Sequence, residues 1–336
     1  MSRVCDVDNR LVERHAALPS VIVIAGPTAS GKSAAALHLA AALNGAIINA
    51  DAMQLYRDLN ILTARPSDTA LARTPHYLYG ILAADEPCSA GRYGALALDA
   101  IAATARAGQV PILVGGSGLY LRALMHGLAP IPSVPASVRE RARALYDRVG
   151  EAAFRDALAA RDPDSAARIK PGDRQRLMRA WEVVEATGRP LPAWHTLPAQ
   201  QAAARFVTIV FLPERDALYE ACDIRFDRMM ARGGLDEARA IASRRLDPAL
   251  PIMKAVGLRP LLRHLAGEIS LVEAGDAAKR ETRHYAKRQV TWFRHQLRAD
   301  QTHVAQYSES LNPEILSFIS EFLLTTDSRD YITGSA

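Results

Sequence analysis

The sequence predicts an α/β protein in which helices cover a parallel β-sheet and an all-helical insertion interrupts the pattern. Five short apolar runs are separated mostly by helical patterns, which is the order expected of parallel strands joined by helices. The runs carry apolar residues on both faces, as strands covered on both sides do. From about residue 130 to 198 no such run occurs, and helical patterns rich in arginine and alanine replace it.

The predicted elements follow in chain order. The first strand is VIVIA at 21–25, and an alanine-rich helix over 33–43 follows it and ends at Asn44-Gly45. The other strands are expected at GAIINAD (45–51), YLYGIL (77–82), VPILVGG (110–116) and FVTIVFLP (206–213). We predict a lead-in over 1–20, a core over 21–130 and 203–310, an insertion of three or four helices over 131–202, and a tail over 311–336 with one amphipathic helix.

The composition indicates a cytoplasmic globular protein. Of the 336 residues, 49% are hydrophobic and 23% are charged. No apolar run reaches the roughly 18 residues that span a bilayer, so no membrane segment is expected. The three cysteines lie far apart without CxxC spacing, so neither a disulfide framework nor a zinc site is indicated.

Positive charge is concentrated near the end of the predicted core. The formal net charge is +5, and the segment 279–298 holds seven Lys or Arg residues against one acid, Glu281. At 100° per residue one helical stripe of this segment contains Arg280, Arg283, Lys287, Thr291, Arg294 and Arg298, and an adjacent apolar stripe contains Ala286, Val290, Phe293 and Leu297. A basic stripe without compensating acids is typical of a surface that binds a phosphate backbone, whereas a solvated surface is the simpler alternative.

A second basic helix is predicted inside the insertion. Asp173 is placed to cap it and Gly188 to end it. Arg176 and Arg179 share one face of this helix, and an apolar stripe is formed by Leu177, Trp181 and Val184. Arginines on a solvated helix face are common, so this pattern alone leaves RNA binding and simple solvent exposure open.

A phosphate-binding loop is the strongest motif in the chain. The fixed positions of GxxxxGK[ST] are all present, directly after a predicted strand and at the start of a helix, in Gly26-Pro27-Thr28-Ala29-Ser30-Gly31-Lys32-Ser33. Its backbone N–H groups can surround a diphosphate, Lys32 adds a full positive charge, and the Ser33 hydroxyl is placed to hold Mg²⁺. The sequence therefore predicts a P-loop NTPase-like core that binds a diphosphate with Mg²⁺.

The loop alone does not identify the molecule that carries the diphosphate. Enzymes that cleave nucleoside triphosphates usually add a strand ending in an aspartate that holds Mg²⁺. Here only the second strand ends in a carboxylate, Asp51, and the fourth leads into a glycine turn that contains Ser117. The carboxyl ends of parallel strands meet at one edge, so both residues are expected near the phosphate loop. The alternatives are that Asp51 caps a helix and that Ser117 is only a turn residue.

Seven motifs in a fixed order give the chain a resemblance to the tRNA dimethylallyltransferases (tRNA isopentenyltransferases). The motifs are GPTASGKS at 26–33, DAMQLY at 51–56, LTARP at 62–66, GGSGLY at 115–120, DRQRLMRA at 173–180, KAVGLR at 254–259 and KRQVTW at 287–292. The matching region extends from about residue 21 to 298.

This resemblance implies a reaction and a set of site residues. It implies transfer of a dimethylallyl group from dimethylallyl diphosphate to N6 of the adenosine directly 3′ of the anticodon, position 37, in tRNAs that read codons beginning with U. By the same resemblance Asp51 is the general base, Lys32 and Ser117 belong to the catalytic site, and the enzyme is a monomer. Residues implied to contact the tRNA anticodon stem-loop are Asp51, Ala52, Met53, Gln54, Ser117, Arg139, Gln175, Arg176, Leu177, Met178, Arg179, Lys254, Arg259, Arg283, Lys287, Arg288 and Arg294.

The chain departs from the family pattern at four positions. Ala52 stands in place of a serine, Ser117 replaces threonine but keeps the hydroxyl, and Leu62 and Leu258 replace glycine and tyrosine. Three other functions share parts of the pattern. These are an adenylate isopentenyltransferase that prenylates free AMP, ADP or ATP, a P-loop small-molecule kinase, and a non-catalytic RNA-binding protein that uses a nucleotide as a switch.

Overall fold

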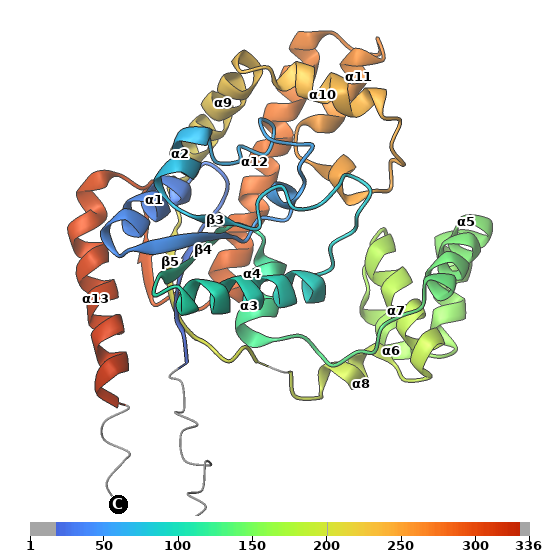
Figure 1. Ribbon diagram of the computed structural model, residues 1–336. Helices are drawn as coiled ribbons and strands as arrows, with labels where there is room; N and C mark the ends of the chain where they lie inside the picture. Colours follow the sequence, from blue (N-terminus) through green and yellow to red (C-terminus); the bar gives the residue numbers. More distant parts are fainter. Residues whose placement is uncertain (1–17, 200, 330–336) are drawn as a thin grey trace, which may run out of the picture. The chain divides into compact units, whose positions relative to one another are not determined.

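The computed structural model describes residues 18–199 and 201–329 (Figure 1). The chain folds into two compact units, the first formed by Met1–Leu124 with Ala203–Ala336 and the second by Met125–Ala202. The expected lead-in lies almost entirely outside the described residues. Among the residues that are described, no helix is long and apolar enough to cross a membrane.

The first unit is built on a parallel sheet, which confirms the predicted fold class. Its six strands lie in the order β3-β2-β4-β1-β5-β6, and each pairs in parallel with its neighbours. The strands are β1 (Ser20–Ala25), β2 (Gly45–Asn49), β3 (His76–Tyr77), β4 (Val110–Gly115), β5 (Arg205–Phe211) and β6 (Gln301–His303). The loops that follow β1, β2 and β4 therefore leave the same edge of the sheet.

Two strands differ from the sequence prediction. The third is shorter than expected because Leu78 and Gly80 adopt positive φ angles of 66° and 61°, which end the extended conformation. The sixth was not predicted, because Gln301–His303 is only three residues long and lacks an apolar run. Asp300 directs this strand to the sheet edge, since its Oδ2 accepts a hydrogen bond from the Thr208 backbone N–H at 2.7 Å.

Helices cover both faces of the sheet. On one face α1 (Lys32–Ala42) and α13 (Asn312–Arg329) pack against alternate strand residues in a single apolar cluster. The helix α3 (Ala90–Arg106) contacts β2 and β4 and contributes nothing to that cluster, so it covers the other face. The amphipathic helix predicted near the C-terminus is α13, and its Ile315 and Ile319 are fully buried in the cluster.

The remaining helices of the first unit lie in the chain segments that follow β2, β4, β5 and β6. They are η1 (Met53–Leu55), α2 (Asp68–Arg73), α4 (Gly118–His126), α9 (Arg215–Ala231), α10 (Gly234–Ser243), η2 (Pro251–Lys254), α11 (Leu258–Leu265), α12 (Leu271–Gln296) and η3 (Glu309–Leu311). A capping box formed by Ser270 and Glu273 starts α12, the longest of them. Its predicted apolar stripe is buried or half-buried, with Ala286 and Phe293 at the centre.

The second unit is helical and has a core of its own. Its helices are α5 (Ala136–Ala159), which is interrupted at Gly150, α6 (Pro163–Arg168), α7 (Arg174–Thr187) and α8 (Leu191–His195). As predicted, Asp173 caps α7 by accepting a hydrogen bond from the Arg176 N–H, and Gly188 ends the helix in the left-handed conformation. The apolar stripe of α7 packs against Phe154 and Leu158 of α5.

Candidate active site

The phosphate loop over residues 26–33 joins β1 to α1 and requires glycine at two positions. A Cβ atom on Gly26 would lie 2.6 Å from the Phe211 carbonyl oxygen. Gly31 has a φ of 85°, and a Cβ there would lie 2.9 Å from Cβ of Tyr307. Neighbouring residues therefore approach the loop so closely that only glycine fits.

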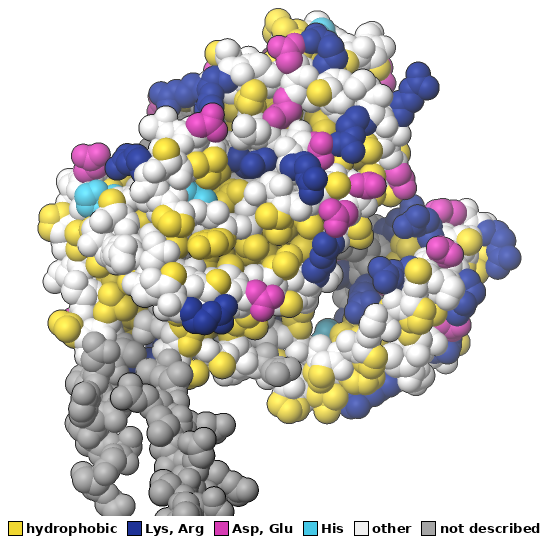
Figure 2. All heavy atoms as spheres, viewed as in Figure 1, with side chains coloured by type: hydrophobic (Ala, Val, Ile, Leu, Met, Phe, Trp, Pro, Cys, Tyr) yellow, Lys and Arg dark blue, Asp and Glu magenta, His cyan; other side chains and the backbone are white. Residues whose placement is uncertain are grey.

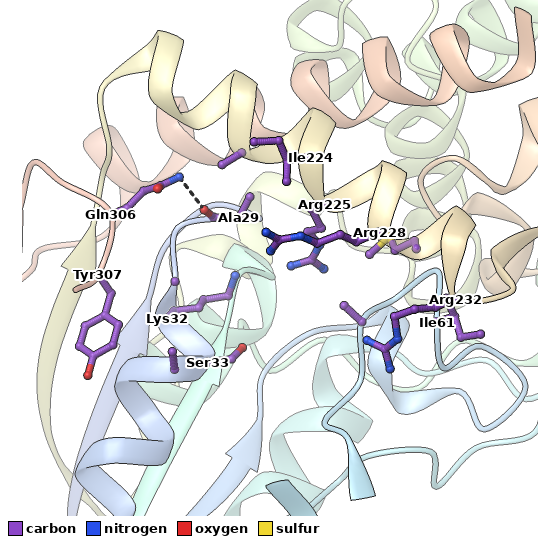
Figure 3. Close-up of a pocket in the computed structure, with 15 residues that line it drawn as sticks. Ala29, Lys32, Ser33, Ile61, Ile224, Arg225, Arg228, Arg232, Gln306 and Tyr307 are labelled. Atoms are coloured by element: carbon purple, nitrogen blue, oxygen red, sulfur yellow. Dashed lines mark hydrogen bonds between the residues drawn. The ribbon is translucent and has the colours of Figure 1, made fainter. Parts of the chain in front are cut away.

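Residues after β6 hold the outer side of this loop. Gln306 donates from Nε2 to the Ala29 carbonyl at 3.2 Å, and the Tyr307 N–H donates to the Ser30 carbonyl at 3.1 Å. Figure 3 shows the first of these contacts as a dashed line. Lys32 adds a third, because its Nζ donates to the Pro27 carbonyl at 3.0 Å. These three bonds fix the curvature of the loop.

A cation-rich cavity of about 490 Å³ lies beside the loop. Lys32 and Ser33 of α1 face it from one side, and α9 and the residue after it contribute three arginines, Arg225, Arg228 and Arg232 (Figure 3). No carboxylate is among its described lining residues. Burial, together with the positive charge of Arg225, lowers the pKa of Lys32 to about 8, although Asp51 opposes this shift. A bound anion would relieve the repulsion between these cations.

The protein ligands at this site are too few to bind Mg²⁺ by themselves, but they fit an Mg²⁺ ion that also binds the phosphate of a ligand. The described residues contain no group of three or more His, Cys, Asp or Glu side chains that could hold a metal ion. Ser33 lines the cavity and offers one hydroxyl oxygen. Mg²⁺ usually keeps several waters and takes few protein ligands beside substrate phosphates, so one hydroxyl is compatible with it.

A second cavity of about 170 Å³ contains both residues predicted at the carboxyl edge of the sheet. Asp51 follows β2 and Ser117 follows β4, and both line this cavity together with Thr28 of the phosphate loop. Arg225 lines both cavities. The apolar wall of the second cavity is formed by Met53, Leu62, Phe226, Met229, Ala255 and Val256.

Backbone hydrogen bonds fix the position of Asp51. Its Oδ1 accepts from the Met53 N–H at 2.9 Å, which closes an Asx turn directly before the short helix η1. The neighbouring Ala52 N–H donates to Ser117 Oγ at 2.9 Å, which ties the loop after β2 to the loop after β4. The N-cap of η1 is Ala52 rather than Asp51, and the Asp51 side chain lines the second cavity.

Two of the cavity residues that sequence reasoning missed lie on helices that follow β5 and carry polar side chains. Arg225 of α9 interacts electrostatically with Asp51, and burial lowers the pKa of its guanidinium while Asp51 raises it. Tyr285 of α12 lines the same cavity as Ser117, and burial raises the pKa of its hydroxyl. Neither residue lies in a motif or in a regular stripe. The only signal in the sequence was that α9 starts at the carboxyl edge of β5.

Two departures from the family pattern have a structural explanation. Leu62 is 6% exposed and faces Gly234, where an added Cβ would lie 3.2 Å from the Leu62 side chain. A glycine on α10 thus makes room for the larger residue. Leu258 is fully buried at the start of α11, so its side chain is part of the core rather than of the surface. Ala52 lines the second cavity.

The residues expected to contact RNA do not all reach the surface. The exposed ones are Arg139, Gln175, Arg176, Lys254, Arg259, Lys287, Arg288 and Arg294. Met178 and Arg179 are half-buried, and Gln54 donates from its amide to the Thr63 and Ala64 carbonyls. The side chain of Leu177 has no exposed surface and packs in the core of the second unit.

The basic surface of α12 is partly neutralised by acids of another helix, which corrects the expectation of a stripe without compensating acids. Arg283 donates to both carboxylate oxygens of Asp223, at 2.7 and 2.6 Å, and Lys279 lies 2.7 Å from Asp227. Both acids belong to α9, whose contact with α12 the sequence of α12 alone does not reveal. Within the described part of the chain, Lys287 forms no ion pair. In the second unit, Figure 2 shows several Lys and Arg side chains over α5 and α7.

Comparison with known proteins shows the family to which the chain belongs. A family model described as IPP transferase matches residues 54–296. The tRNA dimethylallyltransferase of Parvibaculum lavamentivorans is 53% identical over 305 residues, which cover 90% of this chain and 97% of the relative. The tRNA dimethylallyltransferase of Rhodospirillum centenum is 55% identical over 281 residues, which cover 83% and 90%.

A solved structure gives the same result. The crystal structure of the tRNA isopentenylpyrophosphate transferase of Bacillus halodurans has a TM-score of 0.68 and 32% identity, and the match covers 93% of this chain and 99% of that one. Fold, phosphate loop and relatives together define a transferase of the prenyl class. The chain belongs to the IPP transferase family. The predicted family, fold class and enzyme class are thus confirmed.

Proposed function

We propose that this enzyme transfers the dimethylallyl group of dimethylallyl diphosphate to N6 of the adenosine directly 3′ of the anticodon, position 37, in tRNAs that read codons beginning with U. The observation that carries the proposal is the position of Arg225, which lines both the cation-rich cavity and the cavity that contains Asp51. A leaving diphosphate in the first cavity would therefore lie beside a base in the second.

The phosphate loop, Lys32 and Arg225 bind the diphosphate and stabilise it as it leaves. The allylic carbon tolerates positive charge, so the barrier depends strongly on the negative charge that grows on the diphosphate oxygens. Donors already fixed around that charge lower the barrier without reorganising. Ser33 would hold Mg²⁺ against the same oxygens, and the ion would supply further neutralisation of the leaving group. The apolar wall near Leu62 and Phe226 suits the five-carbon chain.

Asp51 accepts the proton of the attacking amine. The N6 lone pair of adenine is delocalised into the ring, so the amine is a weak nucleophile until a base takes its proton. Since Oδ1 of Asp51 is engaged by the Met53 N–H, Oδ2 is the oxygen assigned to this task. Ser117 keeps the adjacent backbone in place through the Ala52 N–H.

Exposed cations bind the tRNA. The target adenine enters the active site after it has flipped out of the base stack. Lys287, Arg288 and Arg294 of α12 and the exposed arginines of the second unit contact the phosphate backbone of the anticodon stem-loop. A stacked base cannot reach a cavity of this size, so it must leave the stack, at a cost of a few kcal/mol. The enzyme acts as a monomer in the cytoplasm, where its tRNA substrate is found.

Asp51→Asn is the direct test. The amide oxygen of asparagine can still accept from the Met53 N–H, so this hydrogen bond is preserved while the base is lost. We expect kcat to fall roughly 10²–10⁴-fold with tRNA affinity unchanged, measured as transfer from labelled dimethylallyl diphosphate to unmodified tRNA. AMP and ATP serve as competing acceptors in the same assay.

The matched control is Asp85→Asn, which makes the same change at an exposed position outside both cavities. It should transfer at the wild-type rate. A wild-type rate in Asp51→Asn would mean that Asp51 only stabilises the turn before η1, and prenylation of AMP in preference to tRNA would replace the proposed acceptor.

A further inference from the structure

Gln289 of α12 is a buried polar residue with both ends of its side chain engaged. It is only 6% exposed, although it lies within the motif whose resemblance implies RNA contact. Its Oε1 accepts from the Thr28 N–H of the phosphate loop at 2.8 Å. Its Nε2 donates to the Gly116 carbonyl, in the turn after β4, at 2.9 Å. One amide therefore bridges two loops that are far apart in the sequence.

Two glycines allow α12 to approach this turn. A Cβ on Gly116 would lie 2.3 Å from Nε2 of Gln289, and a Cβ on Gly118 would lie 2.3 Å from the ring of Trp292. A side chain added at either position would collide with the side chain of Gln289 or Trp292 and would force it to shift. The turn is thus shaped to receive Gln289 and Trp292 at close range.

The bridge continues from the turn to Asp51 through adjacent hydrogen bonds. Ser117, the residue after Gly116, donates from its N–H to the Ala50 carbonyl at 3.2 Å and accepts from the Ala52 N–H at its Oγ. Asp51 lies between these two anchored residues. Four consecutive contacts therefore connect the amide of Thr28 to the backbone on both sides of Asp51.

We propose that Gln289 is a positioning residue, which sets the separation between the phosphate loop and the Asp51 carboxylate. The inference rests on the proposed function, in which the donor and the base must be held at a fixed spacing. Glutamine suits the task because it offers an acceptor to the loop amide and a donor to the turn carbonyl at once. A misplacement of about 1 Å remote from the reacting atoms can cost on the order of 10²-fold in rate.

The test compares two substitutions with a matched control. Gln289→Met keeps the length of the side chain and removes both polar ends. Gln289→Glu keeps the acceptor for Thr28 and replaces the donor to Gly116 with an oxygen, and it serves if the methionine variant does not fold. Gln296→Met makes the first change at an exposed position near the end of the same helix.

We expect both Gln289 variants to lose on the order of 10²-fold in single-turnover transfer at saturating donor and tRNA, with tRNA affinity unchanged and Gln296→Met at the wild-type rate. Thermal melting gives the folded fraction to which each rate is normalised. A Gln289 variant that is less stable but transfers at the wild-type rate would mean that the residue is only structural.

A second readout separates positioning from general weakening. If Gln289 acts through the Ser117 turn, Ser117→Ala combined with Gln289→Met should slow transfer less than the product of the two single effects, because the second change breaks a connection that is already lost. Effects that multiply would overturn the inference. Failure of the wild-type enzyme to prenylate tRNA would instead overturn the proposed function, so the two failures are distinguishable.

Discussion

At the residue scale, Lys32 is where pH should control donor binding. Its pKa is lowered to about 8, mainly by burial and then by Arg225. Only the protonated amine attracts a diphosphate, so the free enzyme should bind the donor with constant affinity below that pKa. Above it the dissociation constant should rise by up to roughly tenfold per pH unit, as measured by calorimetry with dimethylallyl diphosphate between about pH 7 and 10.

Lys32→Arg provides the control for this prediction. A guanidinium stays charged throughout that range, so the variant should show weaker binding, because of its altered shape, but little dependence on pH. A wild-type affinity that stays constant across the whole range would mean that Lys32 does not meet the diphosphate.

Residues of the site differ in how far the sequence could predict them. Asp51 and Ser117 could be placed beside the phosphate loop, because each directly follows a strand and the carboxyl ends of parallel strands share one edge. Arg225 and Gln289 could not, since they reach the site from α9 and α12 and their positions depend on how those helices pack. The ion pair between Asp223 and Arg283 could not be predicted for the same reason, because the two residues lie on different helices.

At the element scale, α13 belongs to the core that supports the phosphate loop. The sequence predicted the helix but separated it from the core as part of a tail, because amphipathicity shows that one face is covered and does not show by what. Ile315 and Ile319 pack in the cluster that also contains residues of β1 and α1. The segment before α13 carries Gln306 and Tyr307, which hydrogen-bond the loop.

Ile319→Ala should therefore destabilise the whole first unit. The side chain is fully buried, and removing such a side chain costs about 2–5 kcal/mol through lost burial and the cavity left behind. Urea unfolding measures the free energy. Leu324→Ala, at a position on the same helix that is 68% exposed, should change it by less than about 0.5 kcal/mol. Equal effects of the two substitutions would mean that α13 is not a core element.

At the scale of the whole molecule, the proposed catalytic residues lie in one unit, whereas the cations assigned to RNA lie in both. Both cavities are lined by residues of the first unit. Exposed cations occur in each unit, including Lys287 of α12 and Arg176 of α7. Donor binding needs only residues of the first unit, whereas the proposed RNA contacts include cations of each unit. This difference separates tRNA from a free adenine nucleotide as the acceptor.

Salt dependence provides the corresponding test. Each phosphate contact releases bound counterions, so Lys287→Ala and Arg176→Ala should each reduce the slope of log affinity against log salt by about 1, and the double variant by about 2. Affinity for dimethylallyl diphosphate should not change in any of them. Arg106→Ala is the control, because Arg106 ends α3 at the opposite edge of the sheet and should leave the slope unaltered. If Arg176→Ala leaves the slope at its wild-type value, one RNA does not engage both units, and the arginines of α7 are an ordinary solvated surface.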